Sequence, residues 1–454
     1  MQWSLARPRA ASAAAVGRRS TASRLGMARD DTGAIAGYCR AVQETFDEQF
    51  YLRAYPDVAE AVRSGGCASA YDHYVRFGIT EGRKASRPAG ELLASRTTDT
   101  IFLELTSRCN LRCTYCAVSQ PTYRGIDLAL DGFDNFLEQM RERGVRVITM
   151  NGHGESTIIK DWEIYSDRLA DAGFRLHITT NMAKRLTPAE IAVLSRFERI
   201  LVSLDTVDPQ LIAQLRRGAS IETIFANIAA VQQFAAARRR SPQIGISCTV
   251  GDISATSILE MVEAFLARDI RMFRFGDLAE YERIDDVMWM QHLSTLPPDH
   301  LAEVSARFRR ALAHIEEEGG SFEIDAPLVS LLLRDQSSSV ELAERDTRIG
   351  DKAVHYVDAD STQTRDCLDP WRMAFVQADA SVRPCCFFEE KLGTLMTHSL
   401  EDVVEGEQFR KLRGEMLSGE LRPNCRSCSA RPLIGRDDFQ RKVEAHLERT
   451  TSTR

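Results

Sequence analysis

The feature that most constrains this chain is a run of three cysteines within eight residues, in the segment LELTSRCNLRCTYCAVSQ at positions 103–120. Cys109, Cys113 and Cys116 come directly after a short apolar run. A structural zinc site closes its shell with four ligands, so a zinc site here would need a distant fourth partner. An iron–sulfur cube that only carries electrons is also held by four thiolates. Three thiolates leave one iron open, so the spacing predicts a cluster at which a substrate or cofactor binds.

The remaining cysteines divide into a second cluster and three isolated residues. Of the eleven cysteines, five lie between 367 and 428, and Cys39, Cys67 and Cys248 stand alone. Isolated cysteines are most often buried apolar fillers. Because the chain carries no sign of export, a disulfide framework is a poor explanation, and we expect a cytoplasmic protein. Clustered thiols in a reducing compartment indicate metal binding.

Composition places the chain among ordinary globular proteins and limits its partners. Hydrophobic residues make up 44% and charged residues 27% of the sequence, and the formal net charge is -7. The acidic balance argues against nucleic-acid binding, which needs a basic surface. No apolar run approaches the roughly 20 residues of a membrane span, so none is expected.

Residues 1–30 differ from the rest, because six arginines but no acidic residue precede Asp30. The pattern suits an organellar transit peptide, a disordered tail, or an over-extended start with Met27 as the true first residue. These three explanations stay open. A secretory signal is disfavoured because the arginines interrupt every apolar run.

Residues 98–280 alternate strand-like and helix-like segments. The strand candidates are short apolar runs that end in polar or glycine residues: TIFLELT, VRVITMNG, FRLHITTN, ERILVSLD, QIGISCTV and IRMFRFGD. Between them, apolar residues recur at helical spacing, as in Phe133, Phe136, Leu137 and Met140. Six such units predict an α/β fold with a parallel sheet and right-handed crossovers. Because six are too few for an eight-fold barrel, we expect either an open doubly wound sheet or a partial barrel.

The flanking segments are shorter and less regular. Residues 31–90 carry aromatic side chains at helical spacing and predict a small helical module. Its pattern, FD..FYL..YPDV, resembles a module found beside bacterial glycosyltransferases, and we expect it to bind a partner protein. Residues 281–366 are expected to form a connecting or substrate region with one clear helix and the strand SFEID. Residues 367–434 hold the second cysteine cluster, and 435–454 are expected to form a C-terminal tail.

The segment CNLRCTYC after LELTSR, followed by the strand and helix repeats, resembles the radical S-adenosylmethionine (SAM) superfamily over residues 100–278. The resemblance implies a six-stranded partial (β/α) barrel, similar to a TIM barrel, and a [4Fe–4S] cluster bound by Cys109, Cys113 and Cys116. It also implies that SAM chelates the open iron and is cleaved reductively to a 5′-deoxyadenosyl radical, which abstracts a substrate hydrogen. A flavodoxin- or ferredoxin-type protein would supply the electron.

Polar residues at successive strand ends match positions that bind SAM in this superfamily. In MNGHGES, Gly152, Gly154 and Glu155 resemble its glycine-rich GGE turn, while His153 departs from it. Small residues there would let backbone carbonyls approach the SAM ammonium group. The other implied SAM-binding residues are Tyr115 against adenine, Thr180 and Asn181 in a TNG-like turn, and Ser203 and Asp205 at ribose-contacting positions. Each alone is as readily a helix cap or a packing residue, and their joint occurrence carries the prediction.

The second cluster comprises Cys367, Cys385, Cys386, Cys425 and Cys428. Taken alone, it also suits a four-cysteine zinc ribbon, although the gap before Cys425 is long. With VRPCC, FRKLR and the final CxxC, it resembles the auxiliary iron–sulfur extension of radical SAM enzymes called SPASM, or its shorter form Twitch. The resemblance implies one auxiliary [4Fe–4S] cluster on Cys367, Cys385, Cys425 and Cys428. The choice between Cys385 and Cys386 stays open.

These features favour an oxidoreductase that dehydrogenates a small-molecule alcohol or sugar. A substrate radical beside a hydroxyl becomes strongly reducing once a base removes the proton, and an auxiliary cluster then accepts the electron. Asp277 and Arg274, at the end of the sixth strand, are the catalytic candidates, and a structural ion pair between them is the alternative. Other functions stay open: a peptide- or protein-modifying enzyme, an epimerase with Cys248 as hydrogen donor, and a non-enzymatic iron–sulfur sensor or scaffold.

Overall fold

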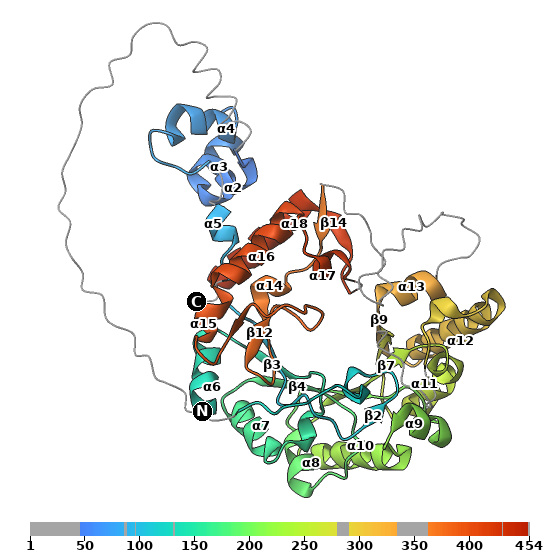
Figure 1. Cartoon of the computed structure of the whole chain (residues 1–454). Coiled ribbons are helices and arrows are strands. Elements are labelled where there is room, and N and C mark those ends of the chain that lie inside the picture. Colours follow the sequence, from blue (N-terminus) through green and yellow to red (C-terminus); the bar gives the residue numbers. More distant parts are fainter. Residues whose placement is uncertain are drawn as a thin grey trace, which may run out of the picture. The chain divides into compact units, whose positions relative to one another are not determined.

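The computed structural model describes residues 46–85, 89–95, 97–129, 132–278, 290–333, 362–428 and 430–452. The chain divides into two compact units, with the boundary between Ala94 and Ser95. Figure 1 shows their helices and strands. The predictions for residues 1–30, Met27 and Cys39, and those for much of 281–366, lie outside the described residues. Within the described residues, no helix combines the length and the apolar character that crossing a membrane requires.

The N-terminal unit is a small group of short helices, as the aromatic spacing predicts. Its elements are α2 (Glu48–Ala54), α3 (Pro56–Arg63), α4 (Ala70–His73), the π-helical turn η1 (Tyr74–Gly78) and α5 (Ala89–Leu92). Asp47 caps α2 by accepting a hydrogen bond from the backbone N–H of Phe50 at 2.8 Å. Tyr51, Val58 and Ala70 are completely buried and form a core for this unit alone.

A ten-stranded sheet forms the second unit, in the order β13-β12-β11-β1-β3-β4-β5-β7-β8-β9. Six of these strands are the predicted ones and run parallel to one another: β1 (Thr100–Leu103), β3 (Val147–Met150), β4 (Arg175–Thr180), β5 (Arg199–Ser203), β7 (Gln243–Val250) and β8 (Met272–Asp277). Ile101 and Leu103 of β1, and Ile200 and Val202 of β5, are completely buried. Burial of the apolar runs therefore accounts for the strands that the sequence predicts.

Helices alternate with these strands and cover the outer face of the sheet (Figure 1). They are α6 (Phe133–Glu142), α7 (Trp162–Asp171), α8 (Pro188–Leu194), α10 (Ile221–Ala236) and α11 (Ile258–Leu266). In α6 the buried residues are Phe133, Phe136 and Met140, at the helical spacing noted in the sequence. Thr187 and Glu190 form a capping box at the start of α8. Local sequence and packing thus specify the same elements.

The C-terminal segment extends the barrel sheet, which we did not predict. β11 (Met373–Val376) pairs in parallel with β1. β12 (Ser381–Arg383) and β13 (Gly393–Thr394) then continue the sheet antiparallel. At the other edge, β9 (Ser321–Ile324) pairs in parallel with β8. Later parts of the chain therefore cover both edges of the six-stranded core.

The segment expected as a C-terminal tail is instead a helix packed on the auxiliary domain. Helix α18 (Arg436–Ser452) buries Phe439, Val443 and Leu447 completely. Their i, i+4, i+8 spacing places them on one face of the helix. The ring of Phe439 meets that of Trp371 edge-on, with the centroids 5.7 Å apart. The prediction of a tail was wrong because the many polar residues concealed this narrow apolar stripe.

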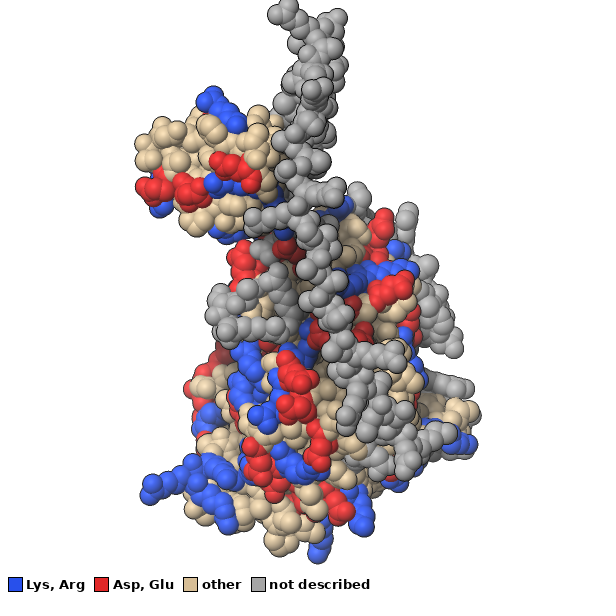
Figure 2. Space-filling view, turned by 90° about the vertical axis from the view of Figure 1, so that its left-hand side faces the viewer, with Lys and Arg blue, Asp and Glu red and all other residues tan. Residues whose placement is uncertain are grey.

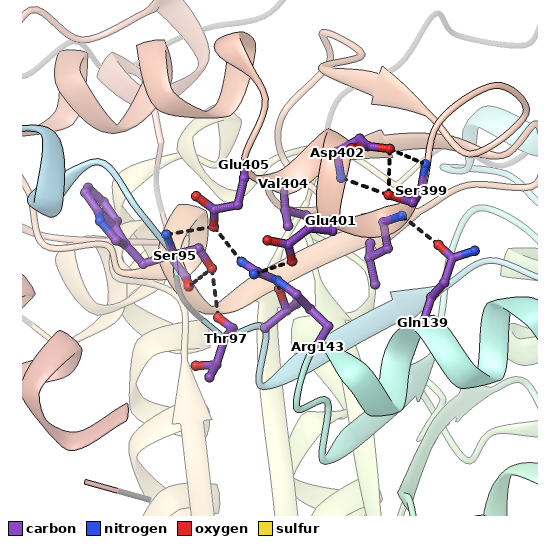
Figure 3. Close-up of polar contacts among 12 residues, drawn as sticks. Ser95, Thr97, Gln139, Arg143, Ser399, Glu401, Asp402, Val404 and Glu405 are labelled. Atoms are coloured by element: carbon purple, nitrogen blue, oxygen red, sulfur yellow. Dashed lines mark hydrogen bonds and ion pairs between the residues drawn. The ribbon is translucent and has the colours of Figure 1, made fainter. Parts of the chain in front are cut away.

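A buried ion-pair network joins the barrel to the auxiliary domain (Figure 3). Arg143, at the C-terminal end of α6, pairs with both Glu401 and Glu405 at 2.5 Å, and its side chain is only 5% exposed. Glu401 lies in α15 (Leu400–Val404), and Glu405 follows this helix. Glu405 also accepts a hydrogen bond from the backbone N–H of Ser95 at 2.9 Å. The network thus links α6, α15 and the first residue of the unit.

Candidate active site

The three-cysteine loop follows β1 and is held by a short strand pairing. β2 (Arg112–Cys113) runs antiparallel to β6 (Arg216–Arg217), which follows helix α9 (Pro209–Leu215). Next to this pairing, the backbone N–H of Thr114 donates to the carbonyl of Leu215 at 2.9 Å. Backbone hydrogen bonds therefore hold the loop in shape from outside.

The three thiols fit the donor set of an iron–sulfur cluster. Burial raises the pKa of Cys113 to about 12; the Arg216 guanidinium opposes this increase, and charge on Cys116 and Cys109 adds to it. Three neighbouring thiolates thus need the positive charge that iron supplies. Among the described residues, no three cysteine, histidine or carboxylate side chains converge as one metal ion requires. A cube binds each thiolate through a different iron, so its ligands need not converge on one point.

The TNG-like turn at the end of β4 lies against this loop. The sulfur of Cys109 accepts hydrogen bonds from the backbone N–H of Leu111 at 3.4 Å and from the amide of Asn181 at 3.6 Å. Asn181 also donates to the side-chain oxygen of Asn110 at 2.9 Å. Hydrogen bonds to ligand sulfurs help to set the reduction potential of iron–sulfur clusters. Asn181 is therefore placed to orient Cys109 and to tune a cluster bound there.

Glu155 ties the end of β3 to the end of β4. Its buried carboxylate accepts hydrogen bonds from the hydroxyls of Thr157 and Thr180, both at 2.8 Å. The other oxygen accepts from the backbone N–H of Asn181 at 2.7 Å. Because the chain itself engages both oxygens, Glu155 positions the turn that contacts Cys109. Its direct role toward the SAM ammonium group stays a prediction.

The two glycines after β3 allow close packing of the cluster loop. A Cβ on Gly154 would lie 2.3 Å from the carbonyl oxygens of Thr106 and Arg108, and one on Gly152 would lie 2.4 Å from a Glu104 oxygen. The absence of a side chain at both positions therefore lets the turn pack closely against the cluster loop, and the role of the glycines toward SAM stays a prediction. His153, between them, donates its backbone N–H to Glu104 at 2.7 Å, and its ring nitrogen Nδ1 lies 3.3 Å from the same oxygen.

At the end of β5, Asp205 is the centre of a buried network. It accepts hydrogen bonds from Arg216 Nε and Nη2 at 2.8 and 2.9 Å, from the backbone N–H of Thr249 at 2.9 Å, and from the hydroxyl of Tyr115. These donors occupy both carboxylate oxygens, so the geometry favours a positioning role over the predicted ribose contact. Tyr115 likewise directs its hydroxyl to Asp205, and Ser203 is half-buried at the end of β5.

Arg216 was missed by the sequence reasoning. Its partner Asp205 lies on the other side of α9, and QLRRG by itself is typical of a helix end. The guanidinium and its carboxylate are both almost completely buried. Cys248 lies in the same interior, where burial raises the pKa of its thiol well above the usual value. A buried thiol behind the cluster loop is poorly placed to donate hydrogen to a substrate.

The catalytic candidates at the end of β8 do not pair with each other. Asp277 Oδ1 lies 3.1 Å from His292 Nε2, whereas Arg274 pairs with Asp325 at 3.4 Å. Asp325, which follows β9, also accepts the backbone N–H of Asp277 at 3.0 Å. Sequence reasoning missed both His292 and Asp325. Asp325 closes the strand SFEID and was detectable by the same strand-end rule, whereas His292 carried no such signal.

The auxiliary cysteines form a second group of neighbouring thiols. Charge on Cys385 raises the pKa of Cys367, and charge on Cys425 raises that of Cys385, in each case after the larger effect of burial. Burial, with Cys428 beside it, raises the pKa of Cys425 to about 12. These charge effects link Cys367 to Cys385, Cys385 to Cys425 and Cys425 to Cys428. Arg365 braces the last pair by donating to the carbonyl of Cys425 at 2.9 Å.

Cys386 connects this group with the barrel. Burial raises the pKa of its thiol to about 11, and the Arg274 guanidinium of β8 opposes the increase. The charge of Arg274 in β8 therefore acts on one of the auxiliary thiols.

Two family models match this chain. The Radical SAM superfamily model covers residues 103–235, and the SPASM model, described as an iron–sulfur cluster-binding domain, covers residues 367–429. The chain thus contains a radical SAM domain followed by a SPASM domain. Its radical SAM domain implies a [4Fe–4S] cluster and SAM, and its SPASM domain implies a further iron–sulfur cluster. The predicted superfamily, fold class and cofactors are confirmed.

Curated relatives resemble part of the chain. The GTP 3′,8-cyclase of Rhodobacter capsulatus is 31% identical over 133 residues, which are 29% of this chain and 39% of the relative. That of Xanthomonas campestris pv. campestris strain 8004 is 30% identical over 188 residues, or 39% of this chain and 54% of the relative. The chain thus spans about half or less of the curated relatives that it matches.

Solved structures resemble most of the chain. Streptococcus suis SuiB bound to S-adenosylmethionine superposes with a TM-score of 0.52 at 13% identity, covering 84% of this chain and 83% of that one. SuiB bound to the precursor peptide SuiA gives a TM-score of 0.50 at 14% identity, covering 80% and 78%. At such identity the likeness establishes the fold of this chain and not its substrate.

Proposed function

We propose that this radical SAM protein is an oxidoreductase that removes two electrons and two protons from a small-molecule alcohol or sugar. The observation that supports this proposal best is the Asp277–His292 pair at the end of β8, where Asp277 Oδ1 lies 3.1 Å from His292 Nε2. The pair supplies a proton acceptor in a chain that also carries an auxiliary iron–sulfur cluster-binding domain.

The cysteines would hold two clusters with different duties. Cys109, Cys113 and Cys116 would bind one through three thiolates, and Cys367, Cys385, Cys425 and Cys428 would bind the other through four. When bound, the first cluster supplies the electron that cleaves SAM to a hydrogen-abstracting 5′-deoxyadenosyl radical, and the second is the acceptor for the electron released from the substrate.

Asp277 is the proposed general base, with His292 as its positioning residue. The Nδ1 atom of His292 lies 3.2 Å from the backbone nitrogen of Ser294 and 2.7 Å from its hydroxyl, and Nε2 lies 3.1 Å from Asp277 Oδ1. In the tautomer in which Nδ1 accepts the backbone N–H, Nε2 donates its proton to Asp277. Oδ2 of Asp277 makes no hydrogen bond with the described residues. That oxygen is therefore available to take the hydroxyl proton, and the contact with His292 fixes the carboxylate plane.

The test uses anaerobically reconstituted protein, SAM, dithionite and a panel of sugar and cyclitol alcohols. Replacing Asp277 with Asn should lower formation of the oxidised product by about 100-fold, the effect expected for loss of a general base, while 5′-deoxyadenosine still forms. Cys109→Ala, as the control, should abolish both products. If wild-type protein forms no 5′-deoxyadenosine, the proposal is wrong.

A further inference from the structure

Arg365 is a buried arginine of the auxiliary domain that lacks a carboxylate partner among the described residues. It is the last residue of β10 (Gln363–Arg365), which pairs antiparallel with β14 (Leu433–Gly435). The residue is only 5% exposed. Removing a cation from water is costly unless an opposite charge accompanies it. The position of Arg365 therefore raises the question of which negative charge it faces.

All three nitrogen atoms of this guanidinium donate to backbone carbonyls around the final CxxC pair. Nε donates to the carbonyl of Cys425 at 2.9 Å, Nη1 to that of Arg431 at 2.9 Å, and Nη2 to that of Arg426. Carbonyl groups are dipoles, so they satisfy the donors but do not neutralise the charge. The chain thus holds a full positive charge against the segment that carries Cys425 and Cys428.

The other buried arginines among the described residues have a carboxylate partner. Arg143, Arg216 and Arg413 all lie within ion-pair distance of an aspartate or a glutamate. On the surface, Figure 2 shows acidic and basic side chains intermingled over most of the face in view. The chain has 65 acidic and 58 basic residues, so carboxylates are not scarce. Arg365 is therefore an exception to the pairing found elsewhere in this molecule.

The negative charge that faces Arg365 comes from the predicted ligand thiols. Burial lowers the pKa of Arg365, and the charges of Cys428 and Cys425 oppose this decrease. The Cys425 carbonyl that accepts Nε of Arg365 also accepts the backbone N–H of Cys428 at 3.4 Å. Cys367 donates its own backbone N–H to the carbonyl of Arg365 at 2.8 Å. Arg365 is thus connected with three of the four predicted ligands of the auxiliary cluster.

A fixed charge at this place affects the reduction potential of a bound cluster. A [4Fe–4S] cluster held by thiolates gains one negative charge when it is reduced, and a nearby cation stabilises the more negative form. Salt and water screen a buried charge much less than an exposed one. Net charge and exposure to solvent are among the factors that set the potentials of iron–sulfur clusters. A buried arginine beside the ligands therefore favours the reduced form.

We propose that Arg365 raises the reduction potential of the cluster on the auxiliary cysteines, so that this cluster can accept an electron from the substrate radical. The radical loses one electron, the cluster gains it, and the hydroxyl proton of the substrate goes to Asp277. The inference rests on the proposed function, because it states what makes the auxiliary cluster an acceptor. Arg365 acts through the cluster ligands and is thus a positioning residue.

The experiment measures this potential in the full-length protein with Cys109, Cys113 and Cys116 replaced by Ala, so that only the auxiliary cluster contributes. A redox titration is followed by electron paramagnetic resonance of the reduced cluster. Arg365→Gln should lower the ratio of reduced to oxidised cluster at a given potential at least tenfold, or about 59 mV for one electron. Arg365→Lys keeps the charge and should stay within threefold of the unsubstituted Arg365 protein.

Arg413→Gln is the matched control, because it removes a buried arginine whose counter-charge is a carboxylate. It should change the ratio less than twofold. An unchanged ratio in Arg365→Gln would overturn the inference, and so would an equal decrease in Arg365→Lys or in Arg413→Gln. Loss of the auxiliary iron from both Arg365 variants would mean that the guanidinium only holds the CxxC loop. The titration needs neither SAM nor a substrate, so its result is distinguishable from failure of the proposed function.

Discussion

Among single residues, the buried Asp205–Arg216 pair has the largest predicted consequence. Its partners support one another: two bonds from the guanidinium, one from the Thr249 backbone and one from Tyr115 satisfy a carboxylate that water does not reach. Removing one member of a buried ion pair leaves the other charge unpaired. The pair also lies behind the cluster loop, because Arg216 begins the strand that pairs with Cys113.

We therefore expect Arg216→Gln to lower the free energy of unfolding by about 3 kcal/mol and to reduce iron incorporation at the loop. Urea unfolding and iron analysis measure the two effects. The double variant Asp205→Asn with Arg216→Gln should be less destabilised than the sum of the single ones, since neither charge is left alone. Tyr115→Phe is the control and should cost only about 1 kcal/mol. If the destabilisation of the double variant equalled the sum for the two single variants, the two residues would not be coupled.

Glu104 is a residue whose effect depends on pH. Burial raises its pKa, but hydrogen bonds from His153 and from the backbone of Ala378 outweigh burial, so the pKa lies below the usual value. A lowered pKa in the folded state stabilises the fold above about pH 4.3, and this contribution disappears as the pH falls through the folded-state pKa. Glu104→Gln should thus destabilise the protein at pH 7 and lose less stability between pH 5 and pH 3 than wild type. The measurement is the unfolding free energy in urea at several pH values in this range. If Glu104 contributed nothing, the plots of this free energy against pH would be parallel for Glu104→Gln and wild type.

At the level of elements, two ion pairs connect α6 with α15 and the residue that follows it, and the two carboxylates differ in their exposure to solvent. The Glu401 side chain is 60% exposed and that of Glu405 only 16% exposed, although both accept from Arg143. Exposed pairs contribute little, whereas a buried partner leaves uncompensated charge when it is removed. Glu401→Gln should cost less than about 1 kcal/mol and Glu405→Gln about 3 kcal/mol in unfolding free energy. Equal costs would mean that exposure does not decide the strength of this junction.

The strands also differ in how readily they can be predicted from the sequence. β5 was predictable because Ile200 and Val202 lie in a continuous apolar run that ends at Asp205. β11 was not, because four residues carry little signal and the partner, β1, lies at the other end of the unit. The same distinction holds in the site. Cys109, Cys113 and Cys116 are recognised by local spacing, but the pairing of Asp277 with His292 depends on how the chain returns after β8.

For the molecule as a whole, one sheet carries both groups of thiols. β11 extends the barrel beside β1, and Cys367 and Cys385 flank β11 in sequence. At the other end of the barrel strands, the charge of Arg274 in β8 acts on Cys386. The shared sheet is therefore the frame that holds the barrel and the auxiliary segment together.

This frame predicts that the two clusters can be separated by mutation. Cys428→Ala should remove the auxiliary cluster, lowering iron by about four atoms per chain, without touching the loop after β1. Because SAM cleavage needs only the three-cysteine loop, 5′-deoxyadenosine should form at near wild-type rate. Oxidised product should be lost, because the substrate radical then has no acceptor and regains hydrogen. Cys67→Ala in the N-terminal unit controls for loss of a thiol and should change neither yield. If Cys428→Ala stopped SAM cleavage itself, with the barrel cluster intact by iron analysis, the auxiliary thiols would have a role before hydrogen abstraction and the proposed order of electron flow would be wrong.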